Sequence, residues 1–188
     1  SISLSTGESL AASGSIMMSA GDASAISGSI VLAAGSSQTL TGGSVSVMSG
    51  AGNIVSGSVI FESGTSQQKS GSVTIQTGKS DAASNSHGSG AVSMTSGNSL
   101  GASGSLSFEA GHSNTVGGGI LLKAGSSTDA TGGSITLKSG DSTENHVGGQ
   151  IDVQTAAGES SGKISLSTGF ANTGDSGNIR MSTGSSAS

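Results

Sequence analysis

Apolar and polar residues alternate along this chain in one short phrase, roughly G-S-[I/V]-x-[L/M/V/F]-x-[S/T/A]-G, which recurs with substitutions thirteen times. The first apolar residue of successive phrases is most often separated by 14 or 15 residues. A period this short and regular indicates one supersecondary unit stacked on itself. This first column is Ile2, Ile16, Ile30, Val45, Val59, Val73, Val92, Leu106, Ile120, Ile135, Ile151, Ile164 and Ile179.

Each phrase adds two further columns, because side chains two residues apart in a strand point the same way. We expect all three columns to face inward, with the small residues of the third letting a facing strand approach closely. The second column is Leu4, Met18, Leu32, Val47, Phe61, Ile75, Met94, Phe108, Leu122, Leu137, Val153, Leu166 and Met181. The third column is Thr6, Ala20, Ala34, Ser49, Ser63, Thr77, Ser96, Ala110, Ala124, Ser139, Thr155, Thr168 and Thr183.

The predicted fold is all-β. Between Gly28 and Gly42 the spacing leaves room for two short strands and two tight corners, but not for a helix. The corner glycines are expected to supply backbone angles that other residues reach only with strain. Residues 1–188 are therefore predicted to form a single β-solenoid of about 13 coils, with 14–15 residues per coil, two short strands per coil and a thin core. Its parallel, in-register strands would lie about 4.8 Å apart.

The second strand of each coil has two possible orientations, which point different columns inward. Burial of Val and Leu, at about 1.5–3 kcal/mol each, favours the more apolar column. If the small column faced inward instead, the apolar one would form an exposed stripe and favour lateral association. The small column is Ser9, Ala23, Ser37, Ser66, Ser80, Ser99, Ser113, Ser127 and Ser142, and the apolar column is Ile26, Leu40, Val55, Val116, Ala130 and Val147.

Two irregularities interrupt the array. The sixth coil is five residues longer than most, through residues 79–89, and an insertion of this kind is expected to form a loop. The eleventh coil departs from the pattern at Ala156-Ala157-Gly158, where the usual glycine is replaced. Both ends of the sequence fall inside a repeat, and neither resembles a cap. We therefore expect the segment to belong to a longer array, or to stack end to end with copies of itself.

Composition restricts the possible partners. The chain has 34 Gly, no Pro and no Cys, and the absence of Pro fits a chain rich in β structure. The net charge of −5 includes only six Lys and Arg, which argues against nucleic acid as a partner. No apolar run approaches the roughly 20 residues of a membrane span.

Catalytic and metal sites have weak support. His112, Ser126 and Asp141 share one corner position in three successive coils, so stacking would place them about 5 Å apart and resemble a triad in composition. The same position is variable in the other coils, as a solvent-facing corner would be. His87 and His146 lack the spacing of metal ligands. We therefore expect no catalytic, cofactor-binding or metal site, and no enzyme activity.

A structural role is the main functional hypothesis. A rod without a pocket would serve as a building unit of an extracellular fibre, stalk or adhesive surface coat, associating end to end and laterally. Its hydroxyl-rich surface could contact polysaccharide or another extracellular surface. Ice binding is the alternative, but the outward residues of the phrases include Met17, Glu62 and Lys123, which interrupt a flat face. A polysaccharide-degrading solenoid would need clustered acids and aromatic residues.

The run Gly133-Ser134-Ile135-Thr136-Leu137-Lys138-Ser139-Gly140 resembles Ser/Gly-rich tandem repeats in very large secreted or surface proteins of microalgae and other aquatic microbes. The resemblance covers the whole chain. It implies an extracellular or cell-surface location and a structural or adhesive role, and it supplies no functional residues.

Overall fold

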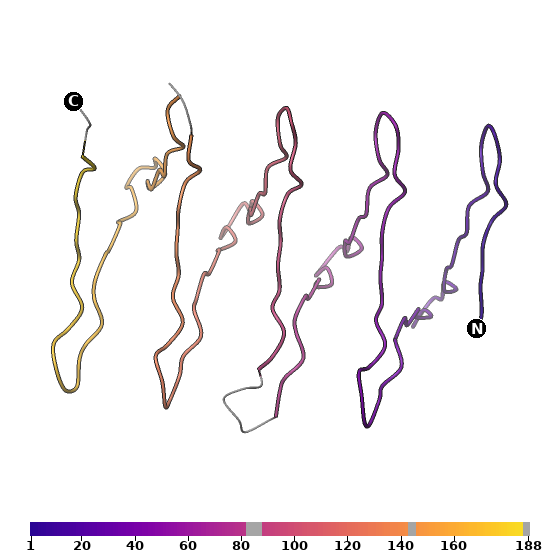
Figure 1. The fold of residues 1–188 in the computed structure, drawn as a ribbon, viewed down its shortest axis with the longest axis horizontal. Helices are drawn as coiled ribbons and strands as arrows, with labels where there is room; N and C mark the ends of the chain where they lie inside the picture. The colour runs from indigo at the N-terminus through magenta and orange to yellow at the C-terminus, as the bar shows by residue number, and fades with distance from the viewer. Residues whose placement is uncertain (82–87, 143–145, 186–188) are drawn as a thin grey trace. The chain divides into compact units, whose positions relative to one another are not determined.

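The computed structural model describes residues 1–81, 88–142 and 146–185. In these ranges the chain forms no helix and no paired strand, and no residue is buried. The chain divides into two units, Ser1–Met94 and Thr95–Ser188. Within each unit an extended phrase leads into a loop, and the loop leads into the next extended phrase (Figure 1).

The predicted β-solenoid of stacked coils is wrong for this structure. A sheet needs a second extended backbone about 4.8 Å away, whose N–H and C=O groups face those of the first. In the described residues the backbone–backbone hydrogen bonds occur at the bases of loops, and no strand pairing forms along the phrases. The repeat therefore specifies a local unit, and this unit does not pair with its neighbours into a sheet.

Neither predicted orientation of a second strand is found. The segments between phrases are loops, with backbone bends at positions such as 24–26 and 38–40. The apolar column expected to face inward is exposed, with Ile26 at 89% and Leu40 at 86% of full exposure. The serine column does not form a core either, because Ser9, Ser37 and their equivalents are also exposed.

The loops close at a neck, which we define as a third-column residue, the glycine after it, and the glycine that opens the next phrase. At six necks the amide of the second glycine donates a hydrogen bond to the carbonyl of the first. These bonds are Gly28 to Gly21 (3.1 Å), Gly43 to Gly35 (2.8 Å), Gly57 to Gly50 (2.9 Å), Gly118 to Gly111 (3.2 Å), Gly133 to Gly125 (2.9 Å) and Gly149 to Gly140 (3.0 Å). The same closure therefore accommodates loops of different length.

The neck explains why the third column is small. A Cβ atom added to Gly118 would lie 3.1 Å from the Cβ of Ala110, and one added to Gly28 would lie 3.1 Å from that of Ala20. The six hydrogen-bonded necks carry Ala or Ser in this column: Ala20, Ala34, Ser49, Ala110, Ala124 and Ser139. The predicted approach of a facing strand is wrong; what lies close to the third column is a glycine of the neck.

The predicted reason for the corner glycines is mostly wrong. Among the described glycines, Gly174 alone has a φ in the left-handed region, at +95°. At some of the glycines that open phrases, such as Gly28 and Gly118, a Cβ atom would lie 3.1 Å from the third-column residue of the previous phrase, so space favours glycine there. At others, such as Gly104 and Gly177, the same contact would be an ordinary one of 3.7–3.8 Å. Gly52 is a further case, because a Cβ atom there would overlap the carbonyl oxygen of Val55.

The two units share this local plan because their sequences correspond. Glycines of the first unit reappear in the second unit 90 residues later, at the same places in the phrases and loops. Gly7, Gly14, Gly21, Gly28, Gly35, Gly42, Gly43 and Gly50 correspond to Gly97, Gly104, Gly111, Gly118, Gly125, Gly132, Gly133 and Gly140. The expectation that residues 1–188 form one array stays a prediction.

Neighbouring glycines offer a matched test of the neck. Gly118→Ala should open the neck, because its methyl group would meet Ala110, whereas the matched variant Gly117→Ala should be tolerated because its Cβ position is open. The measurement is the nuclear Overhauser contact between the Ala110 methyl group and residue 118, together with the exchange rate of the residue 118 amide. We expect Gly118→Ala alone to lose the contact and to exchange faster. Equal behaviour of the two variants would contradict the steric account.

Candidate functional site

The most extensive chemical feature of the chain is its exposed apolar surface. Apart from the terminal Ile2, the side chains of the first column are 43–59% exposed, and those of the second column are 49–90% exposed. Because both columns lie on one side of an extended phrase, each phrase presents a short apolar face. We call the surface formed by the two columns the apolar face; the sequence predicted its residues but placed them in a core.

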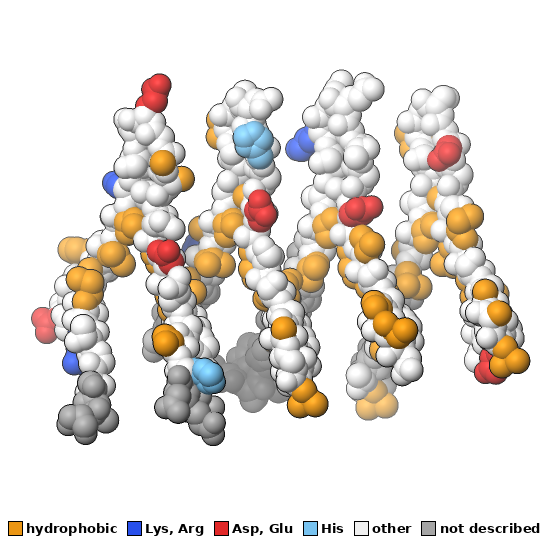
Figure 2. Space-filling model, turned by 90° about the horizontal axis from the view of Figure 1, so that it is seen from above, with side chains coloured by type: hydrophobic (Ala, Val, Ile, Leu, Met, Phe, Trp, Pro, Cys, Tyr) orange, Lys and Arg blue, Asp and Glu red, His pale blue; other side chains and the backbone are white. Residues whose placement is uncertain are grey.

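Apolar residues also occur on the opposite, outward side of some phrases. Met17, Val31, Met48 and Leu121 are each more than 80% exposed. Figure 2 shows hydrophobic side chains recurring on the exposed surface, with charged side chains few and scattered among them. The outward side is thus uneven in size and polarity, whereas the apolar face repeats in every phrase.

One part of the apolar face forms an open hollow. Phe61 lies in the phrase before the loop 64–71, and Val73 and Ile75 lie in the phrase after it. Together with Thr74 these side chains line the hollow. Two successive phrases can therefore bring parts of their apolar faces together, although Phe61 and Ile75 stay largely exposed.

Serine hydroxyl groups organise the loops. Six serines stand two residues after the first glycine of a neck, and each hydroxyl oxygen accepts a hydrogen bond from a backbone amide two or three residues further on. The pairs are Ser9 with Ala11, Ser37 with Leu40, Ser66 with Gln68, Ser99 with Gly101, Ser113 with Thr115, and Ser127 with Ala130, at 3.0–3.3 Å. This local side-chain-to-backbone bond is the usual role of serine in turns.

The serine turns were not predicted, although the sequence carried the signal for them. All six follow the pattern Gly-x-Ser at the start of a loop. The length of the loop also affects the serine turn. At Ser37 and Ser127 the two neck glycines are eight residues apart, and each hydroxyl accepts a hydrogen bond from the amide three residues further on. Six of the nine residues in the small column, which was one of the two candidates for the inward face, are therefore turn-forming serines.

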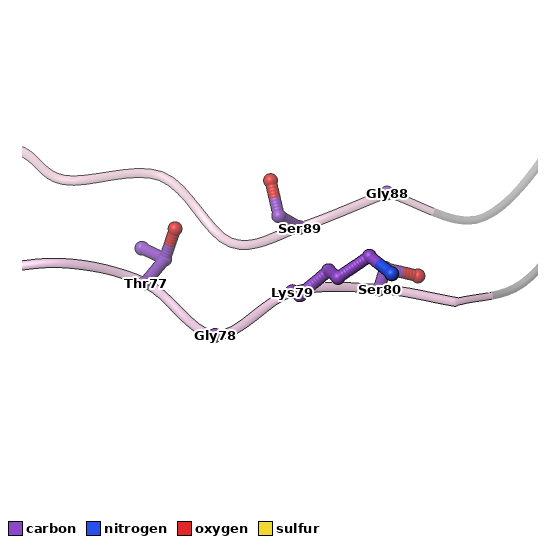
Figure 3. A pocket seen from close by; sticks show the side chains of 6 residues that line it. All are labelled: Thr77, Gly78, Lys79, Ser80, Gly88 and Ser89. Carbon is purple, nitrogen blue, oxygen red and sulfur yellow. The ribbon is translucent and has the colours of Figure 1, made fainter.

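A polar hollow lies at the base of the sixth loop. It is lined by Thr77, Gly78, Lys79, Ser80, Gly88 and Ser89, which come from the two chain segments on either side of that loop. In Figure 3 these segments run beside each other, and the Lys79 side chain extends along the chain toward Ser80. The Lys79 ammonium group forms an ion pair with Asp81. This cation is thus partly neutralised, and the rest of the lining offers only hydroxyl and backbone groups.

The predicted insertion at 79–89 lies only partly in the described chain. Residues 82–87, including His87, lie outside the described residues, so the candidate role of His87 stays untested. His146 is described and is exposed. Among the described residues, no group of three His, Cys, Asp or Glu side chains could hold a metal ion.

The residues that resembled a triad in composition lie in three successive loops. His112, Ser126 and Asp141 each occupy the first position after the first glycine of a neck, and an extended phrase separates each loop from the next. The predicted stacking of these positions depended on the solenoid, which the structure does not form. Asp141 instead pairs with Lys138, whose ammonium group donates a hydrogen bond to the carboxylate at 3.0 Å. Exposed pairs of this kind contribute about 0–1 kcal/mol.

Comparisons with known proteins give no family for this chain: no family model, no curated protein and no solved structure matches it. The resemblance to Ser/Gly-rich repeats of large secreted proteins therefore stays a prediction. In the described part of the chain, no helix has the length and hydropathy needed to cross a membrane.

The serine turns can be tested at Ser99. Its hydroxyl oxygen accepts a hydrogen bond from the amide of Gly101 at 3.0 Å, and an exposed bond of this type contributes about 0.5–1.5 kcal/mol. Ser99→Ala should therefore increase the exchange rate of the Gly101 amide several-fold, while Ser99→Thr should retain protection. The outward variant Ser107→Ala is the matched control. An unchanged Gly101 rate in Ser99→Ala would show that the hydroxyl group does not hold the turn.

Proposed function

We propose that this chain is a structural building unit of an extracellular fibre, stalk or adhesive surface coat, and that it works by self-association. The observation that carries the proposal is the apolar face, which recurs in every phrase and is exposed throughout the described residues. Large apolar surfaces in contact with water favour association, because their burial releases free energy in proportion to area. A chain with such a face along its whole length is suited to cohesion rather than to binding one small ligand.

The proposed partners are other copies of the chain, in contacts that extend end to end and laterally. A polysaccharide or another extracellular surface is a second class of partner, supported by the many exposed serine and threonine hydroxyl groups. The few cations argue against nucleic acid, because phosphate neutralisation needs clustered Lys and Arg. We propose no catalytic activity, since in the described ranges the exposed polar residues do not converge on a reacting position.

Localisation and form can be tested together. We expect gold-labelled antibodies against this chain to decorate the outside of the source cells or their matrix, and electron microscopy of the native material to show continuous filaments or sheets. Labelling confined to the cell interior would contradict the extracellular role. Isolated short particles with closed ends would contradict the fibre role and would make an assay of ice growth the next experiment.

A pair of triple variants can show whether association depends on the apolar face or on the total hydrophobicity of the chain. Replacing Leu32, Leu122 and Leu166 with serine removes three side chains of the second column. Replacing Met17, Val31 and Leu121 with serine removes three outward side chains of similar size. Because each buried side chain contributes at least about 1.5 kcal/mol, the first variant should weaken association by a factor on the order of 10³.

The outward triple variant is expected to change association by less than about tenfold, because its residues lie on the uneven side of the phrases. Dilution calorimetry measures the dissociation constant of each variant. Equal weakening by the two variants would show that association follows total hydrophobicity and not the apolar face.

A further inference from the structure

The backbone of the extended phrases has no partner within the described chain. The backbone–backbone hydrogen bonds of the described residues are the six at the necks, so the amides and carbonyls along the phrases face solvent. An extended segment with free N–H and C=O groups on both edges is a template for pairing with another extended segment. The chain contains no proline, the residue that most directly blocks such pairing.

The accessible surface shows how extensive the missing contacts are. The chain exposes 19072 Å² for a mass of 17.6 kDa. A folded monomer of this mass exposes about 7,900 Å² by the usual scaling of surface with mass. The excess is larger than the roughly 2,000–5,000 Å² that even large protein–protein interfaces bury in total. Because the exposed apolar residues recur in every phrase, a partner that covered them would have to follow the chain over most of its length.

A second copy of the chain is the partner whose repeat matches that of the phrases. Its extended segments have the same length and the same columns, and they recur at the same spacing of mostly 14 or 15 residues. If two copies are offset by a whole number of repeats, each phrase of one copy lies beside a phrase of the other, and the apolar faces of the two copies form one continuous surface. The loops vary in length but close at the same kind of neck, so their differences do not disturb the phrases.

We infer that the extended phrases pair edge to edge with the phrases of further copies of this chain, offset by a whole number of repeats, so that hydrogen-bonded β structure forms only between chains. This inference rests on the proposed function, since it specifies how the copies associate. It differs from a single-chain solenoid, because a chain on its own would have neither paired strands nor a core. The proposed contacts use the phrase edges for hydrogen bonding and the apolar faces for burial.

Hydrogen exchange and light scattering on the 188-residue chain test this inference together. We expect a mass that is a multiple of 17.6 kDa, with slow exchange of amides in phrases such as 29–34 and 134–139 and fast exchange in the loops between necks. Dilution until the chains separate should make the phrase amides exchange at least a hundredfold faster, because their partners belong to other chains.

Proline variants separate edge pairing from association through side chains alone. Ser46→Pro and Thr136→Pro remove an amide at an outward position and leave the apolar columns intact. We expect each to lower the assembled fraction at least tenfold under conditions in which the unmodified chain is half assembled. Ser24→Pro and Ala102→Pro, which lie in loops, are the matched controls and should assemble as the unmodified chain does.

The exchange, scattering and proline experiments together decide whether the phrases pair between chains. Assembly with unprotected phrase amides, or with full tolerance of proline in the phrases, would overturn edge pairing and leave self-association standing. A monomer with exposed phrase amides would overturn both this inference and the proposed function. A monomer with protected phrase amides would show that the chain pairs with itself, and would overturn the inference.

Discussion

The contact between a small side chain and a glycine at each neck is the interaction on which the local structure depends. Ala110 and Gly118 illustrate it, because no side chain fits at residue 118 without displacing the alanine. The close approach brings two backbones together and permits one hydrogen bond between them. At the six hydrogen-bonded necks this closure joins the two ends of the loop, so the local structure there is specified by residues near one another in sequence.

What the necks do not supply is a core. The apolar face of each phrase stays exposed, and the backbone edges of the phrases have no partner in the described chain. Conformational entropy opposes ordering of an extended segment by about 1–2 kcal/mol per residue, and the few exposed hydrogen bonds of the loops cannot offset it. Under the proposed function, contacts between copies of the chain would supply this missing order, which links the local structure to the proposed role in cohesion.

The sequence predicted the local features and failed on the long-range ones. Alternation around Ile30 and Leu32 identified extended phrases, and the small size of Ala20 and Ala110 indicated a close approach, although what lies close to them is a neck glycine and not a facing strand. These are effects of neighbouring residues, and a repeat shows them many times over. The stacking of coils depends on which extended segment lies beside which, and a pattern shared by all thirteen phrases does not distinguish a neighbour in the same chain from one in another copy.

The sequence predicted which residues form the apolar face, but it did not predict that they are exposed. Both apolar columns were identified correctly, but they were placed in a core because apolar periodicity normally signals burial. Ser9 and Ser99 were considered only as a candidate inward column, although a glycine two positions earlier marks a serine turn. The grouping of His112, Ser126 and Asp141 failed because it relied on stacked corners, whereas the structure places these residues in successive loops separated by extended phrases.

The most direct test of the account is sedimentation velocity of the unmodified chain over a wide dilution series. The account predicts complexes heavier than 17.6 kDa at high concentration, and at high dilution a chain of 17.6 kDa that sediments as slowly as an expanded polymer. A compact 17.6 kDa species at every concentration would contradict it, because such a species would have to bury its apolar faces within one chain.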